Sequence, residues 1–246
     1  MGRPRHYSAE VPARCQALIE MLGPQVADDS DPSGRWGGPL KTTFLLAMAT
    51  PMIALPIERI FKPARPNHEG VADDRELDPG LSEEVTRVLA PSRRFDSAPF
   101  YEPDAWNYVP TLNHFNVARD WPLRALRSLQ APAAAQAAAD APARTILLAL
   151  RNALSHGGVT YLDRDGRQAE HATHMIGFAS FAQAHHPELR LLRIGVPHFE
   201  RFLKLWAGWL SSSGVLDRLE ARGPGHFDAI ASNDPSRMPI SAARHR

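Results

Sequence analysis

The stretch Thr145–Leu162, TILLALRNALSHGGVTYL, carries most of the fold information in this 246-residue chain. Its apolar residues recur at i, i+4 and i+7 or i+8, so we predict a helix over Thr145–His156. Gly157 and Gly158 end this helix, and Val159–Leu162 has the composition of a short strand. The stretch therefore predicts a helix followed closely by a small sheet.

The sequence that follows continues the sheet. Asp163-Arg164-Asp165-Gly166 is typical of a hairpin turn, and we predict a return strand within His174–Ser180. Leu189–Gly195 is a third strand candidate. Pro197 then begins a last helix with an apolar face, made by Phe199, Phe202, Leu203, Trp206 and Leu210.

Helical patterns dominate the first sixty residues. Ser8 precedes a helical pattern that runs to Leu22, where Gly23 and Pro24 predict its end. Leu40–Phe61 predicts a long apolar helix, kinked or split near its prolines and buried on nearly all sides at the centre of the core.

The middle of the chain is less regular. Asp78 and Pro79 are typical of a helix start, so we predict a short helix over Leu81–Leu89. We predict two more helices over Trp106–Val117 and Trp121–Leu129. The alanine- and proline-rich tract Ala131–Ala143 is expected to be a linker or a turn between helices.

These elements predict a mainly α fold, a helical bundle with a small antiparallel sheet before the last core helix. We expect one domain over residues 1–222 and a flexible tail over 223–246.

A net charge of +1 excludes a strong global electrostatic field but permits a local basic patch. The single cysteine, Cys15, excludes a cysteine-based metal site. No secretory signal or membrane span is evident, so we expect a cytoplasmic location without a membrane partner.

Three polar side chains interrupt the helix Thr145–His156. At about 100° per residue, Asn152 and His156 share one face, and Arg151 and Ser155 share another. An imidazole beside a guanidinium suits metal-independent RNA cleavage by the 2′-hydroxyl. Histidine would move a proton, and arginine would neutralise charge on the phosphoryl oxygens. Spacing alone favours a structural interpretation, in which Arg151 and His156 cap free carbonyls at the helix end.

Arg151-Asn152-Ala153-Leu154-Ser155-His156 resembles the R-N-x-x-x-H motif of the HEPN family, which comprises helical-bundle proteins that include many ribonucleases of toxin–antitoxin and phage-defence systems. The resemblance extends over Leu147–Leu210 and, more weakly, Leu40–Lys62. It implies a homodimeric endoribonuclease that cleaves single-stranded RNA without metal or cofactor. It also implies that residues 63–143 are an insert atypical of the family.

The same resemblance implies roles for individual residues. Arg151 and His156 would form the catalytic pair, and Asn152 would orient His156 or the phosphate. Ser155 would be an accessory residue. An antitoxin protein would be a candidate partner. In the principal alternative, the chain is a non-catalytic HEPN-fold interaction module, in which the polar cluster caps the helix and anchors the dimer.

Other residues offer weaker hypotheses. Six cationic residues make the C-terminal half locally basic: Arg164, Arg167, Arg190, Arg193, Arg201 and Lys204. Of these, Arg193, Arg201 and Lys204 are candidates for an RNA-binding rim. A third functional hypothesis is a small-molecule pocket beside Trp106, Trp121 and His114, remote from His156. Four histidines also lie close together in sequence, but their spacing matches no known metal site, and we predict none there: His171, His174, His185 and His186.

Overall fold

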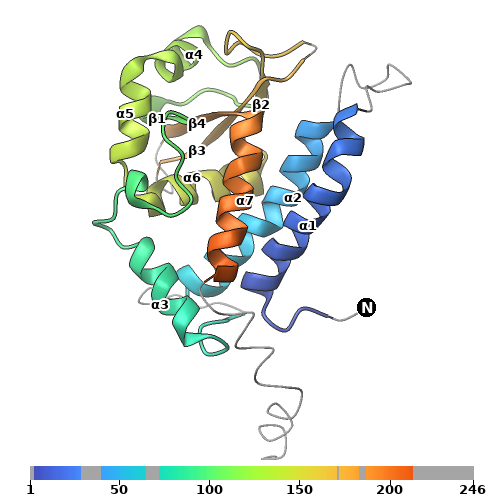
Figure 1. Ribbon diagram of the computed structural model, residues 1–246. Coiled ribbons are helices and arrows are strands. Elements are labelled where there is room, and N and C mark those ends of the chain that lie inside the picture. The colour runs from blue at the N-terminus through green and yellow to red at the C-terminus, as the bar shows by residue number, and fades with distance from the viewer. Residues whose placement is uncertain (1–2, 29–39, 65–71, 171, 183–186, 213–246) are drawn as a thin grey trace, which may run out of the picture.

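The computed structural model describes residues 3–28, 40–64, 72–170, 172–182 and 187–212. Four antiparallel strands form one sheet in the order β1-β4-β3-β2 (Figure 1). The strands are β1 (Trp106–Asn113), β2 (Val159–Leu162), β3 (Met175–Phe181) and β4 (Glu188–Gly195). The predicted tail, 223–246, lies outside the described residues.

The described helices are α1 (Tyr7–Asp28), α2 (Lys41–Pro56), α3 (Pro79–Val88), α4 (Leu123–Gln130), α5 (Pro132–Asp140), α6 (Ala143–His156) and α7 (Val196–Ser212). A π-helix, η1 (Ile57–Phe61), continues α2, and a short 3₁₀ turn, η2 (Phe95–Ser97), precedes β1. The combination of helices with an antiparallel sheet is confirmed. The predicted mainly α helical bundle is not confirmed, because the fold is mixed and the additional strand β1 makes the sheet larger than predicted.

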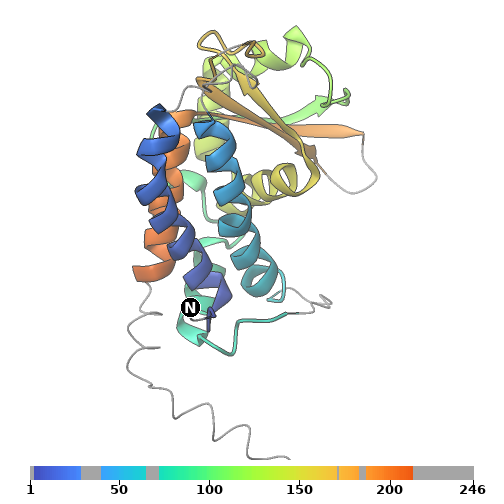
Figure 2. The ribbon, with the colours of Figure 1, turned by 90° about the vertical axis from the view of Figure 1, so that its right-hand side faces the viewer.

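The sheet lies between α6 on one face and α4 on the other, at one end of the long helices α1, α2 and α7 (Figure 2). Strand alternation produces these two faces, because neighbouring side chains point to opposite sides. Ile176, Phe178 and Leu192 join the main core beneath α6. Ala179 and Leu191 pack instead in a second cluster, with α4.

Helix α1 passes through Gly23 and Pro24 to Asp28, so the predicted stop is wrong. Pro24 has no N–H to donate to the carbonyl of Glu20. Glu20 is exposed, and water can satisfy that carbonyl. The proline is therefore tolerated in this helix.

Helix α2 also continues through a proline, Pro51, and changes to the π-helix η1 directly after Pro56. The expected irregularity near Pro56 is confirmed. Burial on nearly all sides is wrong, since Thr43 and Ala47 are exposed. By length and composition alone, Lys41–Phe61 could cross a membrane, although the core helix of a soluble protein meets the same criterion.

A tryptophan from α7 compensates for Pro56. The carbonyl of Met52 would normally accept a hydrogen bond from the N–H of residue 56, which proline lacks. The indole Nε1 of the buried Trp206 donates to this carbonyl at 2.8 Å instead. Helices α2 and α7 are therefore joined where the α-helical ladder is interrupted.

Two middle segments differ from the prediction. Trp106–Asn113 is an edge strand rather than a helix, with a register irregularity around Pro110. Pro is compatible with an edge strand at a bulge. Pro132–Asp140 is helix α5 rather than a linker. The predicted α3, α4, α6, β2, β3, β4 and α7 are confirmed, as is the cap at Asp78, whose Oδ1 accepts from the N–H of Leu81 at 2.8 Å.

Candidate functional site

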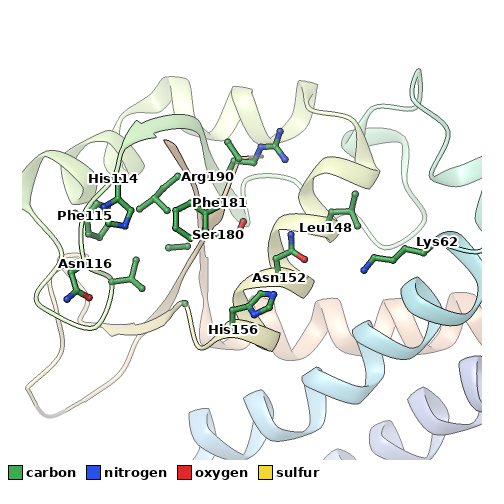
Figure 3. A pocket seen from close by; sticks show the side chains of 15 residues that line it. Lys62, His114, Phe115, Asn116, Leu148, Asn152, His156, Ser180, Phe181 and Arg190 are labelled. Atoms are coloured by element: carbon green, nitrogen blue, oxygen red, sulfur yellow. The ribbon is translucent and has the colours of Figure 1, made fainter. Parts of the chain in front are cut away.

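A cavity of about 890 Å³ opens between the C-terminal half of α6 and the end of the sheet. In Figure 3, His114, Phe115 and Asn116 lie on one side of it and Asn152 and His156 on the other, with Phe181 and Ser180 between them. The lining residues are Lys62, His114, Phe115, Asn116, Val117, Leu148, Asn152, His156, Gly158, Ala179, Ser180, Phe181, Ala182, Leu189 and Arg190.

Helix α6 contributes one stripe of side chains to the cavity, Leu148, Asn152 and His156. These residues are four apart and therefore lie one above another on the helix. His156 is exposed at the last helical position, and Gly157 follows in the left-handed conformation with φ +72°. The predicted shared face of Asn152 and His156 is confirmed.

The backbone of Gly158 brings α6 against strand β3. Its carbonyl accepts a hydrogen bond from the N–H of Ala179 at 2.7 Å. A Cβ on Gly158 would lie 2.0 Å from the carbonyl oxygen of Ala179, so only glycine permits this approach. The contact places Asn152 and His156 beside the end of β3.

The sheet contributes a polar pair that faces α6. Ser180 on β3 lies directly opposite Arg190 on β4 in the antiparallel register. Ser180 is 8% exposed, and its Oγ has no hydrogen-bond partner among the described residues. Arg190 makes no ion pair within the described chain.

Arg151 does not line the cavity. Its Nη2 pairs with Oε1 of Glu58 at 2.5 Å, and its Nη1 donates to Oδ1 of Asn152 at 2.8 Å. Glu58 also pairs with Nζ of Lys62 at 2.7 Å, so one carboxylate is shared by two cations. Arg151 thus holds the Asn152 amide, and only Asn152 of this pair reaches the cavity. Ser155 is exposed and does not line it either.

Aromatic rings line the side of the cavity away from α6. The rings of His114 and Phe181 are nearly parallel, with centroids 5.7 Å apart, and Phe181 is 54% exposed. Phe115 packs edge-on against Trp121, which anchors this segment to the second core cluster. Phe181 therefore presents an apolar ring to the cavity.

The three residues of the hypothetical pocket, Trp106, Trp121 and His114, do not line the described cavity together. Trp106 is buried in the main core and Trp121 in the second cluster, and neither lines the cavity. His114 does line it, together with His156. The cavity is therefore not remote from the motif helix.

The three candidate rim residues do not form one surface. Arg193 belongs to the opposite face of the sheet from Arg190, and its guanidinium donates to Oδ1 of Asn107 at 2.9 Å. Burial lowers its pKa, because burial disfavours the charged form. Arg201 and Lys204 lie on α7 and pair with Glu102 and Glu20. None of the three lines the cavity.

Sequence reasoning missed Lys62, Ser180 and Phe181 as cavity residues. Both strands of the β3–β4 pair were predicted, but their register was not, so the pairing of Ser180 with Arg190 could not be anticipated. Among the described residues, no group of three or more His, Cys, Asp or Glu side chains is placed to hold a metal ion. His171, His185 and His186 lie outside the described residues.

The charges around the cavity favour an anionic ligand. Lys62 and Arg190 line it with two histidines, and no carboxylate occurs among the described lining residues. A concave surface of one sign concentrates ligands of the opposite charge. A scan against protein-family models and searches of curated proteins and solved structures found no match to this chain.

Proposed function

We propose that this protein is a metal-independent endoribonuclease that acts on single-stranded RNA from the cavity beside α6. One observation carries the proposal. His156 and Asn152 of the R-N-x-x-x-H helix open into a cavity that contains two cationic side chains and no described carboxylate lining residue. A phosphodiester backbone is the polyanion that matches both the charge and the proton-transfer group.

The reaction needs one proton removed and one proton delivered. The 2′-oxygen attacks the adjacent phosphorus as its proton passes to a base, and the bond from phosphorus to the 5′-oxygen breaks as that oxygen receives a proton. The products are a 2′,3′-cyclic phosphate and a free 5′-hydroxyl. His156, which is exposed and lines the cavity, would exchange one of these protons, and the cavity cations would stabilise charge on the phosphoryl oxygens.

The HEPN-like assignment adds a dimer to this proposal. One histidine cannot readily act as base and acid in the same step, and a second copy of the chain would supply another His156. His156 and Ser155 at the exposed end of α6 leave this region accessible to a partner chain. An antitoxin protein and a cytoplasmic location belong to the same proposal.

Replacing His156 tests the chemistry. We expect His156→Ala to lower the cleavage rate of a single-stranded RNA by about 100- to 10,000-fold, the usual contribution of general acid–base catalysis. The wild-type rate should persist in EDTA, and the products should carry cyclic phosphates. His198→Ala on α7, where the imidazole is half exposed and pairs with Glu102, is the matched control.

The outcome that contradicts the ribonuclease is equally definite. Cleavage that survives His156→Ala, disappears in EDTA, or falls to the same extent in His198→Ala would exclude His156 as the proton-transfer group. Circular dichroism and size-exclusion chromatography of each variant would separate lost chemistry from lost structure.

The non-catalytic interaction module remains the second candidate, because Arg151 is held by Glu58 and Asn152. A side chain with these contacts fits a structural role. Under that hypothesis, Arg151→Ala lowers stability or dimerisation, and the wild-type protein cuts no RNA. Under the ribonuclease hypothesis, Arg151→Ala displaces Asn152 and lowers the cleavage rate of the folded protein.

A further inference from the structure

We propose that Ser180 and Arg190 form the phosphate-binding subsite of the cavity, so that Arg190 supplies the cation that the motif spacing assigns to Arg151. The inference rests on the proposed function for the identity of the substrate. No sequence motif indicates that these two residues would contact the phosphoryl oxygens.

Strand pairing places the two side chains together. Ser180 and Arg190 are directly opposed in the β3–β4 register, where side chains on the same face are close neighbours. Phe178 and Leu192, two residues further along each strand, pack in the core beneath α6. By alternation, Ser180 and Arg190 point to that same side of the sheet, on which α6 packs.

Ser180 carries an unsatisfied hydrogen-bonding group. Its side chain is more than nine-tenths buried, lines the cavity, and has no described partner for Oγ. A buried hydroxyl without a partner is unfavourable, and such groups occur where a ligand completes the bonding. A phosphoryl oxygen accepts from a hydroxyl and from a guanidinium at once.

Arg190 is the cavity-lining guanidinium, and the described residues place no carboxylate against it. Lys62 and Arg151 both pair with Glu58, whereas Arg190 has no carboxylate partner among the described residues. A planar guanidinium can donate two parallel hydrogen bonds to a phosphate, which suits it to this role. The free cation and the unsatisfied hydroxyl therefore form one anion-binding pair.

Binding of a fluorescent single-stranded oligodeoxynucleotide tests the subsite, because DNA lacks the 2′-hydroxyl and binds without being cut by this route. We expect Arg190→Ala to weaken binding about tenfold to hundredfold, the range for a charge-assisted hydrogen bond. The slope of log affinity against log salt should fall by about 0.7, which corresponds to one phosphate contact on a single strand. Inorganic phosphate should compete for the wild-type site.

Matched variants separate this contact from general charge loss. Arg201→Ala removes an exposed arginine of α7, outside the cavity, and should stay within about twofold of wild type. Arg190→Lys should keep the salt slope but lose affinity, because lysine cannot donate in a bidentate manner. Ser180→Ala should weaken binding about threefold to tenfold without changing the slope.

Several results would overturn the inference: equal losses in Arg190→Ala and Arg201→Ala, a larger loss in Arg151→Ala, or a wild-type protein that binds neither the oligodeoxynucleotide nor phosphate. If Arg190→Ala unfolds, Arg190→Gln replaces it in the same comparison. Loss of binding in Arg190→Ala without any RNA cleavage would leave the subsite standing and reject the ribonuclease. Cleavage that requires His156 but not Arg190 would support the ribonuclease and reject the subsite.

Discussion

Gly157 and Gly158 end helix α6 side by side, but they are required for different reasons. Gly157 adopts φ +72° in open space, so its requirement is conformational alone. Gly158 is not in the left-handed conformation, but a Cβ there would lie 2.0 Å from the carbonyl oxygen of Ala179. Its requirement is steric, and the obstacle is backbone rather than a movable side chain.

Alanine at each position should therefore differ in cost. We expect Gly157→Ala to lower the free energy of unfolding by about 1–2 kcal/mol, the cost of a left-handed non-glycine residue. Gly158→Ala should cost about 3 kcal/mol or more, because the α6–β3 junction must separate. Urea denaturation of both variants measures the difference. Equal losses would show that the close approach of Gly158 to β3 is wrong.

The residue-level predictions succeeded where they depended on local geometry. Asn152 and His156 share a face because they are four apart on one helix, and both reach the cavity. The environment of Arg151 depends on Glu58, which is distant in sequence and brought near because α2, which η1 continues, packs against α6. Helical spacing contains no information about that partner.

At the scale of elements, two segments show which sequence signals were misread. In Trp106–Asn113, Trp106 and Tyr108 are buried while Asn107 and Val109 are partly exposed, an alternation that indicates a strand. Pro110 also argues against a helix here, because proline disfavours a helix interior. In Pro132–Asp140, alanine's high helix propensity and a proline at the first position favour a helix. The two errors are opposite in kind: Pro110 received too little weight against a helix, and the prolines of Ala131–Ala143 received too much.

The contact between α2 and α7 provides a test of an element-level interaction. Trp206→Phe keeps an aromatic ring but leaves the carbonyl of Met52 without its donor. We expect a loss of about 1–3 kcal/mol for the unsatisfied buried carbonyl, in addition to the effect of the smaller ring. Chemical denaturation provides the measurement.

Trp209→Phe on the same helix is the matched control. The indole of Trp209 donates to Oε1 of Glu84 at 3.3 Å, and Glu84 also pairs with Arg87 and is partly exposed. This acceptor remains satisfied when the indole is removed, so the loss should be smaller than for Trp206→Phe. If Trp209→Phe loses as much stability as Trp206→Phe, or more, the role given to the Met52 carbonyl is refuted.

At the scale of the whole molecule, a buried charge joins three distant parts of the chain. Asp74 is fully buried and accepts hydrogen bonds from Nε and Nη2 of Arg59 on η1, at 2.9 and 2.7 Å. It also accepts from Oγ of Ser8 at 2.7 Å and from the backbone N–H of Ser8 at 3.1 Å. The imidazole of His6 lies 3.9 Å away. The start of α1, the π-helix and the segment before α3 therefore meet at one carboxylate.

The Asp74 cluster should make the fold sensitive to acid. Burial acts to raise the pKa of Asp74, but hydrogen bonds from Arg59 and Ser8 outweigh it and hold the pKa below its usual value. A lowered folded-state pKa means that the unfolded chain binds the proton more readily. The stabilisation is therefore present above the unfolded pKa of about 3.9 and is lost as the pH falls through the lower folded value.

Asp74→Asn measures this contribution directly. At pH 7 we expect it to lower the free energy of unfolding by about 2–4 kcal/mol, somewhat less than for a fully buried pair because Arg59 remains 24% exposed. Its stability should also fall less steeply than that of wild type between about pH 5 and pH 2.

Asp73→Asn is the matched control. Asp73 pairs with Arg75 at an exposed site, and its loss should cost below about 0.5 kcal/mol. Urea denaturation across this pH range measures the free energy of unfolding. The role given to Asp74 would be refuted if the stability of Asp74→Asn fell with acid as steeply as that of wild type, or if the two variants lost stability equally.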